Sequence, residues 1–334
     1  MYFVIEYLLF AVKALTVLGL CVLPVIVALV VVRGARRQAP RDQLSIERLN
    51  DQILDSQLQM ESMLCSPKVF KQRLKEAKKT RKAQAAATAP EQNRLFVCAF
   101  AGDLRAQAVS SLREEISAIL SVASAGDEVA IVLESAGGTI HGYGLAASQL
   151  RRIRDRGVRL TVIVDKVAAS GGYMMACVAD LIIAAPFAII GSIGVVAQVP
   201  NFNRLLRKHD IDFELVTAGK YKRTLTMFGE NTRAGREKFQ AEIDDAHALF
   251  KEFVGTHRPQ LDIERVATGE YWFGTRALEL GLVDRLATSD EYIASAAQDR
   301  NVYRVRVERP KSVIDRLLAP VQSLAREHLG TPSP

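Results

Sequence analysis

The stretch EVAIVLESAGGTIHGYGLAASQLRRIRDRGVRLTVIVDK, residues 128–166, combines two apolar runs with an amphipathic segment between them. The runs 128–135 and 159–166 are rich in valine, isoleucine and leucine, which predicts buried β-strands. The segment 142–157 predicts a helix that ends at Gly157. A strand, a helix and a second buried strand in this order indicate a parallel sheet covered by helices, which is the α/β class.

The same alternation continues on both sides of this stretch and predicts a single folded body over residues 94–290. The expected strands are 94–100, 181–186, 188–196 and 213–218, and the expected helices are 107–124, 233–255 and part of 273–288. Residues 291–334 are expected to form a C-terminal extension with an amphipathic helix over 312–329. No internal repeat is present, so the body occurs once.

The N-terminus contains an uncharged run of 19 residues, Ala14–Val32. Such a run is long enough to cross the bilayer core of about 30 Å. Residues 1–10 lack the basic character of a signal peptide, and the apolar run is too long for one. Residues 1–33 are therefore predicted to be an uncleaved, single-pass transmembrane anchor. The arginines between positions 33 and 41 favour a cytosolic location for the flank that follows.

Residues 34–93 are predicted to form a charged helical stalk. Leucines and isoleucines recur at helical spacing over 44–58, which is typical of a partner helix or a short coiled coil. The stretch 68–82 carries eight basic residues and one acidic residue. It could be a solvated helix face, or it could contact anionic lipid headgroups beside the anchor. The sequence leaves these two interpretations open.

The charge of the chain is concentrated in its first part. Residues 1–94 contain 15 Lys and Arg against 8 Asp and Glu, and the other 240 residues contain 29 of each sign. A neutral body argues against a nucleic-acid-binding protein. The four cysteines lie far apart and form no CxxC pair, so neither a zinc site nor a disulfide framework is predicted. No metal and no cofactor is expected.

Two glycine-containing turns suggest hydrolytic chemistry. In VDKVAASGGYMMACVAD, residues 164–180, Ser170 stands between a strand and a helix. Its hydroxyl would be exposed there, and the N–H that follows would point to a developing oxyanion. Ala168 replaces the first glycine of G-x-S-x-G, so this is not the usual hydrolase turn. In ESAGGTIHG, residues 134–142, a glycine pair allows backbone N–H groups to approach a ligand.

A serine nucleophile needs a base. His141 lies beside the glycine pair, and Lys220 and Lys222 follow the expected strand 213–218. A lysine can act as a base when burial lowers its pKa toward neutrality. Local sequence alone leaves all three candidates open.

Four stretches together resemble one family: residues 133–150, 164–180, 186–206 and 217–232. They are similar to the SohB branch of the signal-peptide-peptidase A family, which are membrane-anchored serine–lysine peptidases. The resemblance implies Ser170 as nucleophile, Lys222 as base and Ser192 as the residue that orients the lysine. It implies the backbone N–H groups of Gly138 and Gly171 as the oxyanion hole. The family pattern S-P-G-G departs here only at Ala136.

The resemblance also implies a ClpP/crotonase-type superhelical core and a homo-oligomeric ring in which neighbouring protomers complete each other's sites. It implies an endopeptidase that cleaves signal-peptide remnants or unfolded, membrane-derived polypeptides with small and apolar side chains. Its expected location is the bacterial inner membrane. The family implies a periplasmic body and the arginine flank a cytosolic one, so the side is left open.

Two other functions use the same features. A crotonase-like acyl-CoA enzyme would share the glycine oxyanion hole but use a carboxylate base, for which Glu134 is the candidate. No adenine- or phosphate-binding feature accompanies it. A non-catalytic membrane scaffold would use the basic stalk to recruit partners.

Overall fold

The computed structural model describes residues 13, 43–86 and 93–308. Residues Ser45–Val307 form one compact unit, and the second unit, Met1–Leu44 with Glu308–Pro334, falls almost entirely outside the described residues. The predicted membrane span 14–32 and the predicted helix 312–329 also lie outside them. Among the described residues, no helix is both long and apolar enough to cross a membrane.

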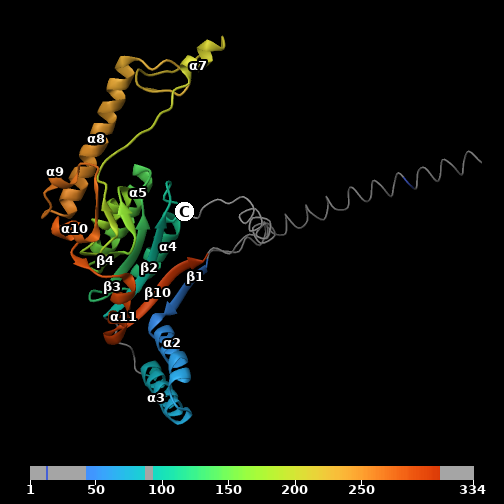
Figure 1. Ribbon diagram of the computed structural model, residues 1–334, viewed down its shortest axis with the longest axis vertical. Coiled ribbons are helices and arrows are strands. Elements are labelled where there is room, and N and C mark those ends of the chain that lie inside the picture. The colour runs from blue at the N-terminus through green and yellow to red at the C-terminus, as the bar shows by residue number, and fades with distance from the viewer. Residues whose placement is uncertain (1–12, 14–42, 87–92, 309–334) are drawn as a thin grey trace, which may run out of the picture. The chain divides into compact units, whose positions relative to one another are not determined.

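One sheet forms the centre of the fold, with a main strand order of β1-β10-β2-β3-β4-β6-β9 (Figure 1). From β10 to β9 all neighbours are parallel, and β2 and β3 pair in register from Leu95↔Glu128 to Gly102↔Ser135. The predicted α/β class is confirmed. The strands of this path are β1 (Gln43–Arg48), β2 (Arg94–Gly102), β3 (Glu128–Ser135), β4 (Arg159–Val164), β6 (Leu181–Ala184), β9 (Arg285–Leu286) and β10 (Asn301–Glu308).

Three short strands leave the main path at the carboxyl end of β3. Ser135, the last residue of β3, pairs with Ala168 of β5 (Val167–Ala169). Strand β5 pairs in parallel with β7 (Ile189–Gly191), and β7 pairs antiparallel with β8 (Tyr271–Phe273). Strands β5 and β7 follow β4 and β6 in the chain and pair outside the main path, and this mixed α/β arrangement fits the expected ClpP/crotonase-type core.

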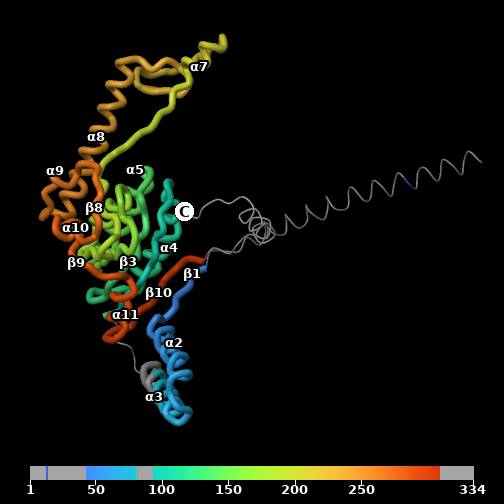
Figure 2. Tube along the Cα trace, viewed as in Figure 1, coloured from blue at the N-terminus to red at the C-terminus, as the bar shows by residue number. Residues whose placement is uncertain are grey.

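Helices cover both faces of the sheet (Figures 1 and 2). Alternating residues of β2 show the two faces: Phe96, Cys98 and Phe100 pack in one core, and Leu95 and Val97 in the other. The first core contains residues of α4, α5, α6 and the end of α8, and the second contains residues of α2 and α11. The helices are α2 (Leu49–Leu64), α3 (Pro67–Ala86), α4 (Val109–Leu120), α5 (Ile140–Asp155), α6 (Gly171–Ala176), α7 (Asn203–Lys208), α8 (Arg233–His257), α9 (Ile263–Val266), α10 (Gly274–Glu279) and α11 (Ser289–Asp299).

The predicted stalk begins with strand β1 and continues as the helix pair α2 and α3. An ion pair between Arg81 and Asp55, with 2.8 Å between Nη2 and Oδ1, joins the two helices. Asn50 connects α2 to the end of the body: its Nδ2 donates to the Ala297 carbonyl at 2.9 Å, and its Oδ1 accepts from the Val302 N–H at 2.8 Å. In the sheet, β1 pairs with β10, which lies between β1 and β2. The sequence analysis did not predict strand β10.

The predicted strand 213–218 is wrong. These residues have no regular secondary structure, and their side chains are exposed. Val216 is 92% exposed. A strand needs a neighbouring strand for its backbone hydrogen bonds, and no described residue pairs with this segment. Its apolar side chains explain why the sequence suggested a strand.

A buried carboxylate anchors the start of β3. Asp127 is 1% exposed and accepts hydrogen bonds from the guanidinium and N–H of Arg94 and from the N–H and hydroxyl of Ser124. Burial acts to raise the pKa of Asp127, but these hydrogen bonds outweigh it and hold the pKa below its usual value.

We expect Asp127→Asn to lower the free energy of unfolding by about 2 kcal/mol at pH 7. Because the folded-state pKa is lowered, this stability is present above the unfolded pKa of about 4 and is lost as pH falls through the folded value. Urea titrations at pH 7 and pH 3 should therefore show the difference from wild type shrinking at pH 3. Asp155→Asn, which alters an exposed ion pair, should leave stability almost unchanged at both pH values. An equal loss for Asp127→Asn at both pH values would contradict the linkage.

Candidate active site

Ser170 occupies a strained turn between β5 and α6. Its backbone has φ +52° and ψ −118°, in a region that residues with a side chain rarely adopt. The Ser170 N–H donates to the Gly191 carbonyl at 2.7 Å, and the Ser170 carbonyl accepts from the Met174 N–H at 3.0 Å. The turn is therefore fixed by β7 on one side and by the first turn of α6 on the other. Such strain is typical of functional sites.

The glycine pair lies directly against this turn. Gly137 has φ +92°, and a Cβ atom built on it would lie 2.8 Å from both the Ser170 Cβ and the Gly171 nitrogen. A Cβ on Gly138 would lie 2.2 Å from the Leu104 carbonyl oxygen. Both positions require glycine because the backbone approaches too closely for any side chain. The structure thus brings Gly138, Ser170 and Gly171 together.

A cavity of about 750 Å³ opens beside these residues. Its walls are mainly apolar, and α8 contributes part of them, between Ile243 and Phe253. The lining residues are Gly138, Thr139, Ile140, His141, Gly144, Ser148, Ser170, Gly171, Met174, Gly194, Val195, Val196, Ile243, Ala246, Leu249, Phe250 and Phe253. A site of this size and polarity can hold apolar side chains of a peptide.

Ser192 lies next to the serine turn. It follows β7 directly after Gly191, whose carbonyl accepts the Ser170 N–H. Ser192 also has a positive φ, +50°, and its N–H donates to the Glu270 carbonyl at 2.6 Å. Its side chain is half-buried. Two neighbouring strained serines thus end the neighbouring strands β5 and β7.

The structure does not bring Lys222 to Ser170 within one protomer. Lys222 is exposed in an irregular segment, where its N–H donates to the Gly219 carbonyl at 3.1 Å. It is absent from the described residues that line the cavity. Lys220 is also exposed, and its ammonium lies over the Tyr221 ring at 5.1 Å from the centroid. His141 does line the cavity, with an exposed side chain at the start of α5.

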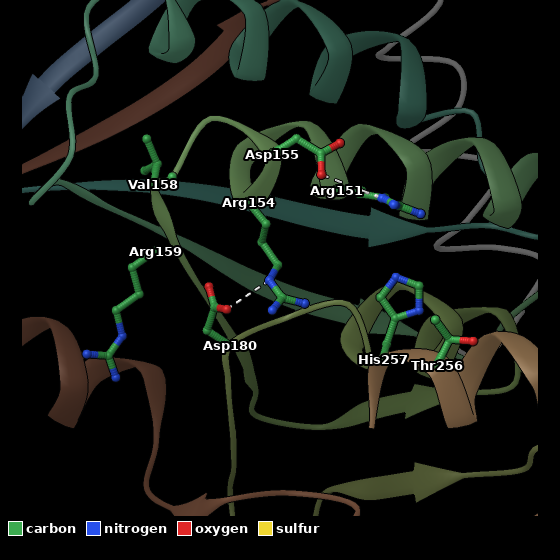
Figure 3. A pocket seen from close by; sticks show the side chains of 9 residues that line it. Arg151, Arg154, Asp155, Val158, Arg159, Asp180, Thr256 and His257 are labelled. Carbon is green, nitrogen blue, oxygen red and sulfur yellow. Dashed lines mark ion pairs between the residues drawn. The ribbon is translucent and has the colours of Figure 1, made fainter. Parts of the chain in front are cut away.

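A second cavity, of about 660 Å³, lies at the amino end of β4 and so at the opposite edge of the sheet. Figure 3 shows Arg154 reaching Asp180, with His257 and Thr256 contributed by the end of α8. The Thr256 hydroxyl donates to the Glu252 carbonyl at 2.8 Å. Helices α5 and α8 both end here, so the cations offset the negative helix termini. This arrangement is a charge balance rather than a site for nucleophilic chemistry.

The thiols in the body are not poised for reaction. Cys98 and Cys177 are fully buried, and burial raises the pKa of both. Among the residues that the structure describes, no group of three or more His, Cys, Asp or Glu could hold a metal ion.

The sequence analysis missed two residues beneath the glycine turn, Ser135 and Tyr143. Ser135 Oγ accepts from the Gly137 N–H at 3.0 Å and lies 2.5 Å from the Tyr143 hydroxyl. The signal available in the sequence was a serine two positions before a glycine and a tyrosine in the first turn of the following helix. Neither residue type by itself indicates a contact of this kind.

Comparison with known proteins gives consistent matches. The model of peptidase family S49 matches residues 152–303, and the model of the S49 N-terminal region matches residues 2–150. A probable protease SohB from Haemophilus influenzae is 46% identical over 319 residues, which cover 92% of this chain and 90% of that protein. A probable protease SohB from Buchnera aphidicola subsp. Acyrthosiphon pisum is 60% identical over 228 residues, 68% of each protein.

Among solved structures, a mutant of the 1510-N membrane-bound stomatin-specific protease aligns with a TM-score of 0.43 and 12% identity. The alignment covers 61% of this chain and 84% of that one. The sequence matches are far stronger than this structural match. Because both S49 models match and a 46% identical SohB protease aligns over nine-tenths of the sequence, the chain belongs to peptidase family S49, as a SohB-type peptidase.

Proposed function

We propose that the chain is a membrane-anchored serine endopeptidase with Ser170 as nucleophile and Lys222 as general base. The observation that supports this most is the position of Ser170, on a strained turn that faces the apolar cavity and touches the glycine pair. The N–H groups of Gly138 and Gly171 form the oxyanion hole in this proposal. Ser192, at the end of the neighbouring strand, orients the lysine amine.

The reaction follows from these roles. Neutral Lys222 takes the proton from the Ser170 hydroxyl as Oγ forms a bond to the peptide carbonyl carbon. The carbonyl oxygen becomes an oxyanion, and the two glycine N–H groups stabilise it. The C–N bond breaks as Lys222 returns the proton to the leaving amine. Water, activated by the same lysine, then releases the acyl group from Ser170.

Lys222 reaches Ser170 from a neighbouring protomer in this proposal. Within residues 199–232, Gly229 is the only residue that is buried. Leu205, Ile211, Val216 and Phe228 are exposed in this segment. A soluble surface rarely exposes so many large apolar side chains together, so a partner is needed to cover them. A second copy of the chain would bury these residues and supply the lysine in the same contact, which favours a homo-oligomeric ring.

The lining of the cavity indicates which substrate side chains it can bind. Ile243, Leu249, Phe250 and Phe253 of α8 line the same cavity as Ser170 and Gly171 and make part of its wall apolar. Burying an apolar side chain there stabilises the complex, whereas a charged one would lose its hydration. The cavity thus supports substrates with apolar side chains, and the family resemblance leads us to expect signal-peptide remnants or unfolded, membrane-derived polypeptides.

The membrane assignment depends on residues 14–32 as a single-pass anchor in the bacterial inner membrane. Helix α3 supplies a headgroup contact in this proposal, because five of its lysines are exposed: Lys68, Lys71, Lys75, Lys78 and Lys79. Cationic side chains close to a bilayer are attracted to anionic lipids. In this proposal α3 therefore adds an electrostatic contact to the hydrophobic one.

Covalent labelling tests the nucleophile. A fluorophosphonate should form one adduct per active site on the full-length protein in detergent, and peptide mapping should locate it at Ser170. Ser170→Ala should remain unlabelled, whereas Ser148→Ala, which removes another hydroxyl on the cavity wall, should be labelled. A wild-type protein that resists labelling while it remains folded would contradict the proposal. The acyl-CoA enzyme and the scaffold would both give that result.

A further inference from the structure

Two buried hydroxyl groups, on Ser135 and Tyr143, form a series of hydrogen bonds beneath the glycine turn. The donor and acceptor in each bond are fixed. Ser135 is 2% exposed, and Tyr143 is fully buried. The Tyr143 hydroxyl donates to the Asp103 carbonyl at 2.8 Å. Since each hydroxyl has one proton, Ser135 must donate to the Tyr143 oxygen across their 2.5 Å contact. The Ser135 oxygen is then left to accept the Gly137 N–H at 3.0 Å.

The donors and acceptors in this series of hydrogen bonds stay the same at any pH near neutrality. Burial raises the pKa of the Tyr143 phenol above its ordinary value. Tyr143 therefore keeps its proton and remains a donor to Asp103. Ser135 therefore continues to donate to Tyr143, and its oxygen continues to accept from the Gly137 N–H.

Tyr143 also contacts the other side of the site. A Cβ atom on Gly171 would lie 2.4 Å from the Tyr143 Cγ, so the ring packs directly against the residue that follows the nucleophile. A Cβ on Gly102 would lie 2.4 Å from the Tyr143 hydroxyl and 2.6 Å from Ser135 Oγ. The two hydroxyls are thus enclosed. A small movement of the tyrosine would bring it into contact with the backbone at Gly102 and at Gly171.

We propose that Tyr143 and Ser135 are positioning residues that set the direction of the two oxyanion donors. Ser135 holds the Ala136–Gly137 peptide through the Gly137 N–H. This fixes the start of the glycine turn, from which the next peptide, with the Gly138 N–H, continues through the positive φ of Gly137. The Tyr143 ring supports Gly171 from below. This inference rests on the proposed function, because it assigns these donors to the developing oxyanion. Such donors act only when they lie about 2.7–3.1 Å from the oxyanion, so a small misalignment lowers the rate.

The test is Tyr143→Phe, which keeps the ring against Gly171 and removes the hydroxyl. With an unfolded, apolar peptide as substrate, we expect kcat to fall roughly tenfold while KM changes less than about twofold. The second-order rate of fluorophosphonate labelling should fall by a similar factor. Ser135→Ala should do the same. The double variant should lose no more than either single variant, because both remove one network.

Tyr173→Phe is the matched control. Tyr173 is also fully buried, and its hydroxyl donates to the Leu282 carbonyl at 2.9 Å, away from the glycine turn. It should lose similar thermal stability but keep its kcat. If Tyr143→Phe loses stability and keeps both kcat and labelling rate, the inference is overturned. Failure of the proposed function looks different, because the wild-type protein would then not be labelled at all.

Discussion

Replacing Ser170 by alanine is expected to lower the rate of peptide hydrolysis by at least about a thousandfold. No other hydroxyl lies on the strained turn that ends β5, and Ser192 in the proposed mechanism orients the lysine, so we expect no other group to form the acyl intermediate in its place. The remaining glycine N–H groups would still bind the carbonyl oxygen, and KM should therefore change little. Initial rates with a fluorogenic apolar peptide would measure both quantities.

The variant should fold normally, because alanine adopts the positive-φ backbone conformation of Ser170 about as poorly as serine does. A thermal midpoint within a few degrees of wild type would confirm this. Ser121→Ala serves as the control for loss of a hydroxyl, since Ser121 is exposed and its hydroxyl donates to the Ala118 carbonyl of the same helix end, at 2.6 Å. Full activity in Ser170→Ala would end the assignment of the nucleophile.

Lys222→Ala is expected to be as inactive as Ser170→Ala, yet mixing the two variants should restore activity. Each site in the proposed ring takes its serine from one protomer and its lysine from the next. In a randomly assembled mixture of equal parts, about one site in four receives both residues. Unfolding and reassembling the two variants together, then measuring hydrolysis, should give about a quarter of the wild-type rate.

Three controls test whether the loss of activity is specific to Lys222 and whether the restored activity requires both variants. Lys220→Ala changes a lysine two positions away and should be fully active by itself. Each inactive variant reassembled alone should stay inactive. If the mixture also stays inactive although it forms mixed oligomers, Lys222 would act within its own protomer or not at all. Activity retained by Lys222→Ala and lost in His141→Ala would instead identify the histidine on the cavity wall as the base.

The parts of the fold that the sequence predicted well are those with strong local signals. Strands β2, β3 and β4 are apolar runs bounded by turns, and α5 and α8 have clear helical periodicity. Each of these elements is specified by residues within itself. The serine turn was predictable for the same reason, because Ser170 and its glycines are adjacent in the chain.

Elements that depend on distant partners were not predictable in the same way. Strand β10 alternates arginine with valine and tyrosine, which is typical of a segment on the surface. Only the structure shows that β1 and β2 lie on either side of it. The segment 213–218 has the composition of a strand but lacks a neighbour. The contact of Tyr143 with Gly171 joins residues 28 positions apart, and only the packing of α5 on α6 reveals it.

The place of β10 in the sheet has a consequence for how the molecule is made. In the sheet order β1-β10-β2, the first strand of the described residues, β1, has no direct neighbour among the strands synthesised soon after it. Domains generally begin to fold from the N-terminal side while the nascent chain is still on the ribosome. Here β1 and the start of α2 must wait until residues 301–308 have emerged. The sheet that carries the serine turn is thus completed only after residues 301–308 have been synthesised.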